Sequence, residues 1–195
     1  MAFFLNKFGS SALLSALRIS VIMLFSPQIK IPATYMRGGT SKGVFFKLDD
    51  LPLEAQQPGP FRDKILMRVI GSPDPYGKQI DGMGGATSST SKTVIVSKSS
   101  QPDHDIDYLF GQVSIDQAFV DWSGNCGNLT AAVGAFAIQE SLIDPSKVPE
   151  NGHCTVKIWQ KIFRKRSLRI FLYPQDTYKK SEILNLMGSL FLQQK

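Results

Sequence analysis

The residues Asn128–Leu142, NLTAAVGAFAIQESL, have helical character and are apolar on most faces of the helix they would form. Such a helix has to be buried on nearly every side, because its surface is too apolar to face water. The rest of residues 31–160 consists of short strand-like runs separated by turns rich in Gly, Pro and Ser. Many short strands around one apolar helix predict an α+β domain in which a sheet wraps the helix.

Two of the strand-like runs, Ile31–Gly39 and Gly43–Leu48, flank the turn sequence GGTSKG, which predicts a hairpin. Pro60–Ser72 has apolar residues at helical spacing followed by a glycine, which predicts a helix and its end. Ser72–Thr90 is dense in Gly, Pro and Ser and predicts a loop, and the run Lys92–Lys98 after it predicts a buried strand. We expect further strands at Asp107–Ile115, Gln117–Trp122 and Cys154–Gln160.

The net charge of +6 is concentrated at the two ends of the chain. Residues 161–195 contain eight Lys or Arg and two acidic residues, whereas residues 29–160 contain twelve basic and fourteen acidic residues. The middle of the chain therefore does not attract polyanions, and we expect neither a nucleic-acid nor a membrane partner. The alternative is a protein that binds through its basic tail, in which case binding would weaken steeply with salt.

Cys126 stands in the sequence SGNCGN, directly before the apolar helix. A residue at this place faces unpaired backbone N–H groups and the positive end of the helix dipole, which favours a reactive thiolate. The amides of Gly127 and Asn128 could hold a carboxylate. The alternative is a buried, inert cysteine that packs as a small apolar residue, and we assign Cys154 to that class.

The two cysteines and two histidines of the chain do not have zinc-ligand spacing, so we expect no metal. Such sparse cysteine usage does not suggest a disulfide framework, and we expect a reducing, cytoplasmic setting.

Lys92 lies at the junction between a loop of small residues and an apolar strand. Partial burial there favours a neutral amine that can act as a general base. The alternative is an ordinary strand-end lysine with a solvated head group. The hydroxyl residues of Ser88–Ser91 can donate hydrogen bonds to anions, but they do not form a Walker A loop, because Ser91 stands where that motif needs Gly.

The sequence RGGTSKG, Arg37–Gly43, combines an arginine, a glycine turn and two hydroxyl residues. An arginine fork beside such a turn is suited to clamping a carboxylate. By itself, however, the motif indicates no more than the turn of a hairpin.

Three stretches together resemble successive signatures of the PrpF family: YMRGGTSKGVFF, IGSPDPYGKQIDGMGGATSSTSKTVIVSKSS and VDWSGNCGNLTAAVGAFAI. Members of this family are 2-methylaconitate isomerases of the methylcitrate route for propionate breakdown. The resemblance is nearly continuous from Pro27 to Gln160. It implies a diaminopimelate-epimerase-like fold, with two similar domains that each wrap a barrel-like sheet around a central helix and an active site in the cleft between them. It also implies a reaction without metal or organic cofactor.

The resemblance further implies that Lys92 is the catalytic lysine and Cys126 the active-site cysteine. The reaction would shift an allylic proton and the double bond of a small unsaturated tricarboxylate, with Lys92 as the base. Cys126 is either a partner acid or a positioning group. The residues that we expect to hold the substrate carboxylates are Arg37, Ser41, Thr90, Asn125, Gly127 and Asn128.

The domain organisation that follows has three segments. Residues 1–26 are an N-terminal extension outside the family pattern, whose apolar run Ala12–Phe25 is too short to cross a membrane and lacks a signal-peptidase site. Met23 would be a more natural start. Residues 27–160 form a PrpF-like N-terminal domain, and residues 161–195 are expected to be an out-of-frame tail of low order, with the second domain missing.

The tail hypothesis rests on a frame test. Back-translation of KIFRKRSLRIFL and reading one nucleotide earlier gives KNIQKKIIAHIP, and LMGSLFLQQK gives DGVTFPAAE; both products resemble the continuation of the family after Gln160. We therefore expect a truncated isomerase domain that is weakly active or inactive. The alternative function is a non-catalytic fragment that binds small carboxylates, and the possibility of a homo-oligomer stays open.

Overall fold

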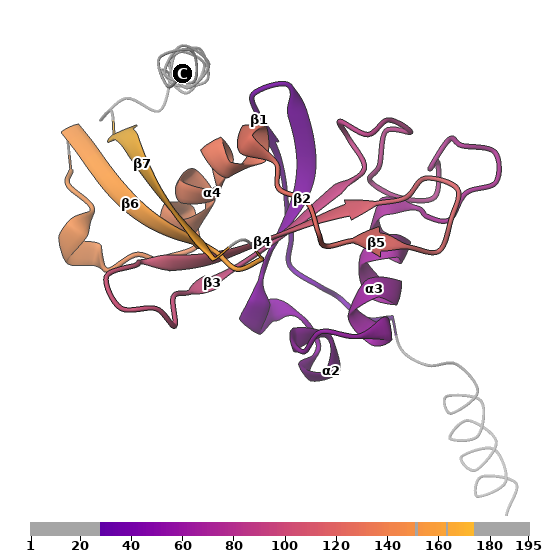
Figure 1. The fold of residues 1–195 in the computed structure, drawn as a ribbon, viewed down its shortest axis with the longest axis horizontal. Coiled ribbons are helices and arrows are strands. Elements are labelled where there is room, and N and C mark those ends of the chain that lie inside the picture. Colours follow the sequence, from indigo (N-terminus) through magenta and orange to yellow (C-terminus); the bar gives the residue numbers. More distant parts are fainter. Residues whose placement is uncertain (1–27, 151, 163, 174–195) are drawn as a thin grey trace, which may run out of the picture. The chain divides into compact units, whose positions relative to one another are not determined.

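The computed structural model describes residues 28–150, 152–162 and 164–173. The predicted N-terminal extension and residues 174–195 of the predicted tail lie outside these described residues. From Ile31 onward the described residues belong to one compact unit, whose elements are shown in Figure 1.

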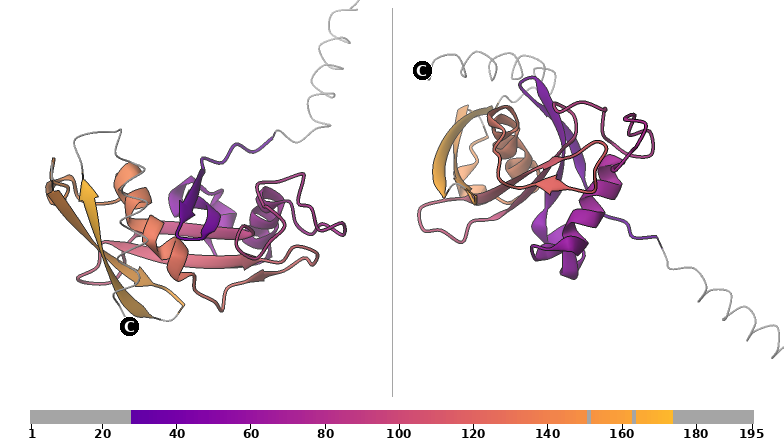
Figure 2. Two further views of the ribbon diagram at one scale, coloured as in Figure 1. Left: turned by 90° about the horizontal axis from the view of Figure 1, so that it is seen from above. Right: turned by 45° about the vertical axis from the view of Figure 1, so that its right-hand side comes forward.

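The described unit is a mixed α+β structure built on one strongly curled, half-barrel sheet (Figures 1 and 2). The strand order is β1-β2-β3-β4-β6-β7, with the short strand β5 paired to β4. The pairs β2–β3 and β4–β6 are parallel, and the other pairs are antiparallel. The strands are β1 (Thr34–Gly38), β2 (Ser41–Lys47), β3 (Lys92–Lys98), β4 (Ile106–Val113), β5 (Val120–Asp121), β6 (Gly152–Gln160) and β7 (Lys165–Tyr173).

The α-helices of the described residues lie on both faces of the sheet. Helix α4 (Gly127–Gln139) lies between the β1–β2 hairpin and the β6–β7 hairpin, whereas α3 (Pro60–Ile70) packs on the opposite face (Figures 1 and 2). The remaining helical elements are α2 (Leu53–Gln56) and the 3-10 turns η1 (Leu48–Asp50) and η2 (Pro145–Lys147).

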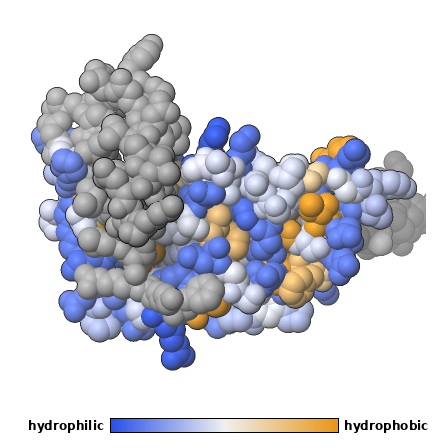
Figure 3. Space-filling view, turned by 45° about the horizontal axis from the view of Figure 1, so that its top comes forward, coloured by the Kyte–Doolittle hydropathy of each residue, from blue (hydrophilic) through white to orange (hydrophobic). Residues whose placement is uncertain are grey.

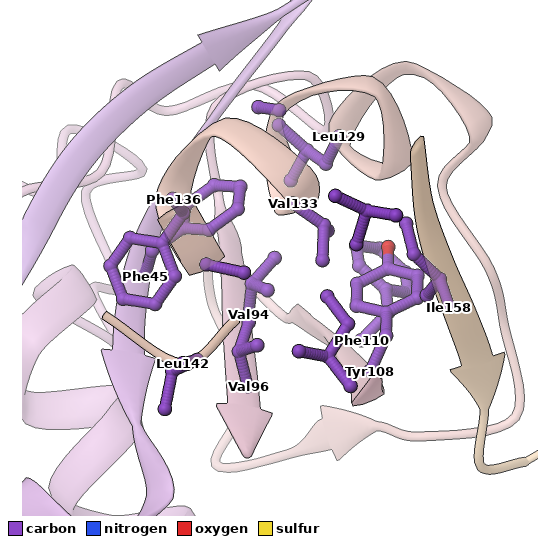
Figure 4. Packing of buried hydrophobic residues seen from close by; sticks show 14 of the residues in the cluster. Phe45, Val94, Val96, Tyr108, Phe110, Leu129, Val133, Phe136, Leu142 and Ile158 are labelled. Atoms are coloured by element: carbon purple, nitrogen blue, oxygen red, sulfur yellow. The ribbon is translucent and has the colours of Figure 1, made fainter. Parts of the chain in front are cut away.

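Strand β3 divides the interior into two cores because its side chains alternate between the two faces of the sheet. Val94 and Val96 point to the α4 side, and Ile95 points to the α3 side. The α4 core includes Phe45, Tyr108, Phe110, Leu129, Val133, Phe136 and Ile158 (Figure 4). The α3 core includes Val44, Phe46, Leu66, Met67, Ile70, Val113 and Val120.

The predicted apolar helix is confirmed as α4. Leu129 and Val133 have no exposed surface and Phe136 is 2% exposed, and all three side chains pack against the strands (Figure 4). Burial of an apolar side chain of this size contributes about 1.5–3 kcal/mol. Helix α4 is therefore held mainly by tertiary packing of its apolar surface against the curled sheet.

Several sequence predictions are confirmed at close to the expected bounds. The predicted strand Lys92–Lys98 is β3, and the predicted helix is α3, which has Pro60 in its first turn and ends at Gly71 with a φ of 85°. The predicted hairpin is present, but its turn is shorter than expected, because Ser41 already pairs with Gly38 as part of β2.

The strand predicted at Gln117–Trp122 is wrong over most of its length. Only Val120 and Asp121 pair with β4, as the short strand β5. The chain then turns, and the Asp121 carboxylate accepts hydrogen bonds from the backbone N–H and the hydroxyl of Ser123, at 2.8 and 2.6 Å. This local turn competes with continued strand pairing.

The glycine-rich loop between α3 and β3 is organised around the side chain of Gln79, which is 1% exposed. Its Nε2 donates to Ser72 Oγ at 2.9 Å. Its Oε1 accepts from the Ala86 backbone N–H at 2.8 Å and from Ser91 Oγ at 3.0 Å. These bonds fix the loop immediately before Lys92, so the position at which β3 starts is well defined.

Strand β7 lies within the segment predicted as an out-of-frame tail. It pairs with β6 along its whole length, from Lys165 opposite Gln160 to Tyr173 opposite Gly152. The pairing shows regular structure over residues 165–173 but does not test the reading frame, so the tail hypothesis stays a prediction.

Some large apolar side chains remain exposed at the loop that precedes β3. Tyr76 and Ile80 are more than 80% exposed, and Met83 in the same loop is 43% exposed. Phe119, in the turn between β4 and β5, is 57% exposed, and the two loops are joined by the hydrogen bond from Asp74 N–H to the Ile115 carbonyl. Figure 3 shows apolar areas set among polar side chains on one face. Within the described part of the chain, no helix is both long and apolar enough to span a bilayer.

Candidate active site

One edge of the sheet brings together residues from β2, β3 and β4. Strands β2 and β3 are parallel, so both begin at the same edge of the sheet, and the antiparallel β4 brings its C-terminal end to that edge. Alternation places Ser41, Lys92 and Gln112 on the side that also carries Phe45, Val94 and Phe110 of the α4 core. This edge is the candidate active site.

Cys126 is the N-cap residue of α4, as the sequence predicted, and is 8% exposed. Its thiol lies 3.7 Å from the Ser41 hydroxyl, within hydrogen-bond distance for sulfur. Its carbonyl oxygen accepts from the Thr130 N–H and hydroxyl at 2.9 and 2.8 Å, and from the Tyr108 hydroxyl at 3.4 Å. The backbone of Cys126 is thus fixed, while its side chain makes no capping bond and points to β2.

The first turn of α4 rests directly on the β1–β2 hairpin. A Cβ atom at Gly38 would overlap the carbonyl oxygen of Asn128, so only glycine allows this approach. Asn128 Nδ2 donates to the Thr40 hydroxyl at 2.9 Å, which adds a side-chain hydrogen bond between α4 and the hairpin turn. This contact determines how far Cys126 lies from Ser41.

Lys92 is the first residue of β3 and is 8% exposed. Its Nζ donates to Gln112 Oε1 at 2.5 Å and lies 5.0 Å from the centroid of the Phe110 ring. The alternative of a strand-end lysine with a solvated head group is therefore wrong. The amine is buried and held in a fixed direction on the α4 side of the sheet.

Lys92 and the segment that carries Cys126 share two apolar neighbours. The Phe110 ring lies next to Lys92 Nζ and within van der Waals distance of the Gly124 position. Leu129, in the first turn of α4, packs on Gly43 of β2, which in turn contacts the Lys92 backbone. The predicted pair thus lies on one face, at the N-terminal end of α4.

The remaining predicted residues are placed differently from one another. Arg37 is exposed and lies on the face of β1 opposite to that of Gly38, because side chains alternate along a strand. Its Nε donates to the Gly39 carbonyl at 2.9 Å. Thr90 lies in the turn before Lys92, where its hydroxyl is 2.8 Å from that of Thr87.

Asn125 and Gly127 flank Cys126 and are exposed. Among the predicted substrate-binding residues, the structure therefore brings Ser41, Asn125, Gly127 and Asn128 close to Cys126 and directs Arg37 away from it.

Gln112 is the residue of this site that sequence analysis missed. It lies directly opposite Lys92 in the β3–β4 register and is 20 residues away in sequence. A polar residue near the end of the β4 run, after Leu109, Phe110 and Gly111, was the available signal, but only the strand register connects it with Lys92. Within the described ranges, no cluster of three or more His, Cys, Asp and Glu side chains is arranged to hold a metal ion.

A family model described as "PrpF protein" matches residues 28–167. The chain belongs to the PrpF family. Among curated PrpF-like relatives, it is 77% identical to the 2-methyl-aconitate isomerase of Shewanella oneidensis over 137 residues, which is 70% of this chain and 34% of the relative. It is also 77% identical to the 2-methyl-aconitate isomerase of Cupriavidus necator over 138 residues, 71% of this chain and 35% of the relative.

More distant PrpF-like relatives act on other compounds according to their names. The 4-oxalomesaconate tautomerase of Pseudomonas putida is 53% identical over 61% of this chain and 31% of its own length. A solved structure of methylitaconate-delta-isomerase matches 76% of this chain and 62% of that chain, with a TM-score of 0.68 and 44% identity. This PrpF chain spans about a third of the length of the curated relatives, and its fold is that of the matched part of the isomerase structure.

Proposed function

We propose that this PrpF chain carries the proton-transfer pair of a 2-methylaconitate isomerase, with Lys92 as base and Cys126 as proton donor. The observation that supports the proposal best is the buried amine of Lys92, held by Gln112 on the same face of the sheet as the thiol at the start of α4. The 77% identity to two enzymes named 2-methyl-aconitate isomerase supports the choice of substrate, a small unsaturated tricarboxylate.

The reaction is a shift of one proton along an allylic system. The neutral amine of Lys92 takes the proton of an allylic C–H bond, and the electron pair spreads over the neighbouring double bond and carboxylate. Cys126 returns a proton at the other allylic carbon, and the double bond moves. The proton then passes from the Lys92 ammonium to the Cys126 thiolate, so that the net reaction consumes no proton and no cofactor.

The carboxylates of the substrate need hydrogen-bond donors that are fixed before the reaction starts. The exposed amide of Gly127, in the first turn of α4, is suited to this, because the first N–H groups of a helix have no partner within the helix. Ser41, Asn125 and Asn128 lie around the same helix end. We propose that Thr90 and Arg37 contact a second carboxylate of the substrate. For Arg37 this contact requires a change of side-chain direction.

The complete fold is part of the proposal. We infer a diaminopimelate-epimerase-like arrangement in which the described unit is one wall of the active site and a second, similar domain is the other. The match to about a third of the relatives' length supports this inference. The described unit assayed by itself should therefore turn over slowly, because a displacement of about 1 Å can lower a rate roughly 100-fold.

Protection by trans-aconitate tests the proposal. The chain is treated with a lysine reagent and a thiol reagent, with and without trans-aconitate, and modification of Lys92 and Cys126 is measured by mass spectrometry. We expect the ligand to slow both modifications and to leave exposed Lys64 and Lys78 unchanged. If neither Lys92 nor Cys126 is protected at any ligand concentration, the proposed site is wrong.

The second candidate function is a fragment that binds small carboxylates without turnover. A unit that supplies one wall of the proposed cleft can bind a carboxylate without completing the proton transfer. Protection without conversion of 2-methylaconitate would support the fragment, and conversion would support the isomerase. Restoring the reading frame at the Gln160 codon and assaying the product beside this chain tests the tail hypothesis in the same experiment.

A further inference from the structure

We propose that Gln112 is a positioning residue that holds the amine of Lys92 and directs its lone pair. The inference rests on the proposed function, in which Lys92 is the base. Gln112 lies directly opposite Lys92 in the antiparallel β3–β4 pair, and its Oε1 is 2.5 Å from Lys92 Nζ. The contact is therefore built into the strand register and does not depend on a flexible loop.

The orientation of the Gln112 amide follows from its second hydrogen bond. Its Nε2 donates to the Ser91 carbonyl at 2.8 Å, and a carbonyl oxygen can only accept. The amide oxygen must then face Lys92, which always has an N–H group to donate. The two partners together fix which end of the amide meets the lysine.

The Ser91 carbonyl is itself held in place. The same oxygen accepts from the Val113 backbone N–H at 2.9 Å. On the other side of the residue, the Ser91 hydroxyl shares its single hydrogen between two acceptors, the Thr87 carbonyl at 2.7 Å and Gln79 Oε1 at 3.0 Å. A continuous set of hydrogen bonds thus runs from the buried Gln79 through Ser91 and Gln112 to the Lys92 amine.

A neutral acceptor at this place has a specific chemical consequence. A neutral amine has two N–H bonds and one lone pair, and donation of one N–H to Gln112 leaves the lone pair pointing away from β4. A carboxylate would instead stabilise the ammonium, which is not a base, and an apolar side chain would leave the amine unheld. Glutamine thus orients the Lys92 amine without forming an ion pair with it.

The charged and titratable groups around Gln112 and Lys92 come from three elements. Asp121 of β5 pairs with Gln112 in the β4–β5 register, on the side of β4 away from β3. Ser123 donates to the Asp121 carboxylate from its hydroxyl and its backbone N–H, which holds the pKa of that carboxyl below its usual range. Cys126 lies at the start of α4, and the exposed Lys42 lies on β2. In the sheet register, Gln112 therefore separates the amine of Lys92 from the carboxylate of Asp121.

The test is the pH dependence of Lys92 labelling in the full chain. Lysines are acetylated competitively between about pH 7 and pH 11, and the extent at Lys92 is compared by mass spectrometry with that at exposed Lys64 and Lys78. The variants are Gln112→Glu, which adds a charge, Gln112→Met, which has a similar shape but only a weak thioether acceptor, and Gln112→Asn, which keeps the amide on a shorter side chain. Gln117→Glu, an exposed change of the same charge on the β4–β5 turn, is the matched control.

Gln112→Glu should change the labelling of Lys92 in the opposite direction from Gln112→Met and Gln112→Asn. Gln112→Glu should slow acetylation of Lys92 by about tenfold relative to Lys64 and Lys78 at neutral pH, because the added carboxylate stabilises the unreactive ammonium. Gln112→Met should speed it, and Gln112→Asn, whose amide is one methylene too short, should do the same. Gln117→Glu should leave it unchanged.

A purely structural role for Gln112 would not produce opposite shifts. The positioning role is refuted if the pH profile of Lys92 labelling is the same in Gln112→Glu, in Gln112→Asn and in the control Gln117→Glu. These two Gln112 variants retain a polar side chain, and their thermal unfolding shows that the folded protein is being compared. Failure of the proposed function would appear separately, as a lack of trans-aconitate protection in the unmodified chain.

Discussion

The contact between α4 and the β1–β2 hairpin can be tested by adding one methyl group at Gly38. A Cβ atom there would overlap the Asn128 carbonyl oxygen and lie 3.0 Å from Leu129 Cα. Both obstacles are backbone atoms, so no side-chain rotation can relieve the overlap, and the first turn of α4 has to move. Overpacking of this kind costs about 1–3 kcal/mol. At about 4 °C per kcal/mol for a domain of this size, Gly38→Ala should lower Tm by about 4–12 °C.

The same substitution should change the environment of Cys126. Because the thiol is held 3.7 Å from Ser41 by the position of α4, a shift of the first turn should expose it and speed its reaction with a disulfide reagent. Gly124→Ala is the matched control: a Cβ atom there would lie 3.5 Å from Phe110 Cε1, an ordinary contact. If Gly38→Ala unfolds at the same temperature and reacts at the same rate as Gly124→Ala, the argument for this close approach is wrong.

Three further predictions concern the core, the loop before β3 and the second cysteine. Phe136→Ala should lower the free energy of unfolding by about 3–5 kcal/mol in urea titrations, because the ring is 2% exposed. Backbone N–H groups donate to the Asp74 carboxylate, that of Tyr76 with the largest effect, and hold its pKa below the usual range. The ionised Asp74 should therefore stabilise the fold above about pH 4, and this stabilisation should be lost as the pH falls further. Asp74→Asn should make Tm depend less on pH in this acidic range. Burial raises the pKa of the Cys154 thiol, so thiol titration should find only Cys126 reactive before unfolding and both cysteines afterwards.

Local sequence signals were sufficient for the elements that carry the site. The β-branched run of β3 and the apolar run of α4 each specify their element through the side chains of that segment alone. For the same reason, Lys92 at the start of a strand and Cys126 at the start of a helix could be placed from the sequence. The predicted and observed bounds agree best for β3, because a lysine stands at each end of its apolar run, Lys92 and Lys98.

The sequence determined that α4 must be buried, that Lys92 begins a strand and that Cys126 precedes a helix. The tertiary structure decided which side chains these two residues meet: Gln112 for the amine and Ser41 for the thiol, with Arg37 on the other face of β1. The physical reason is that strand register and the distance between helix and sheet depend on packing between segments far apart in the chain. A shift of one residue in the β3–β4 register would turn Gln112 away from Lys92, and no local signal in either strand reports that register.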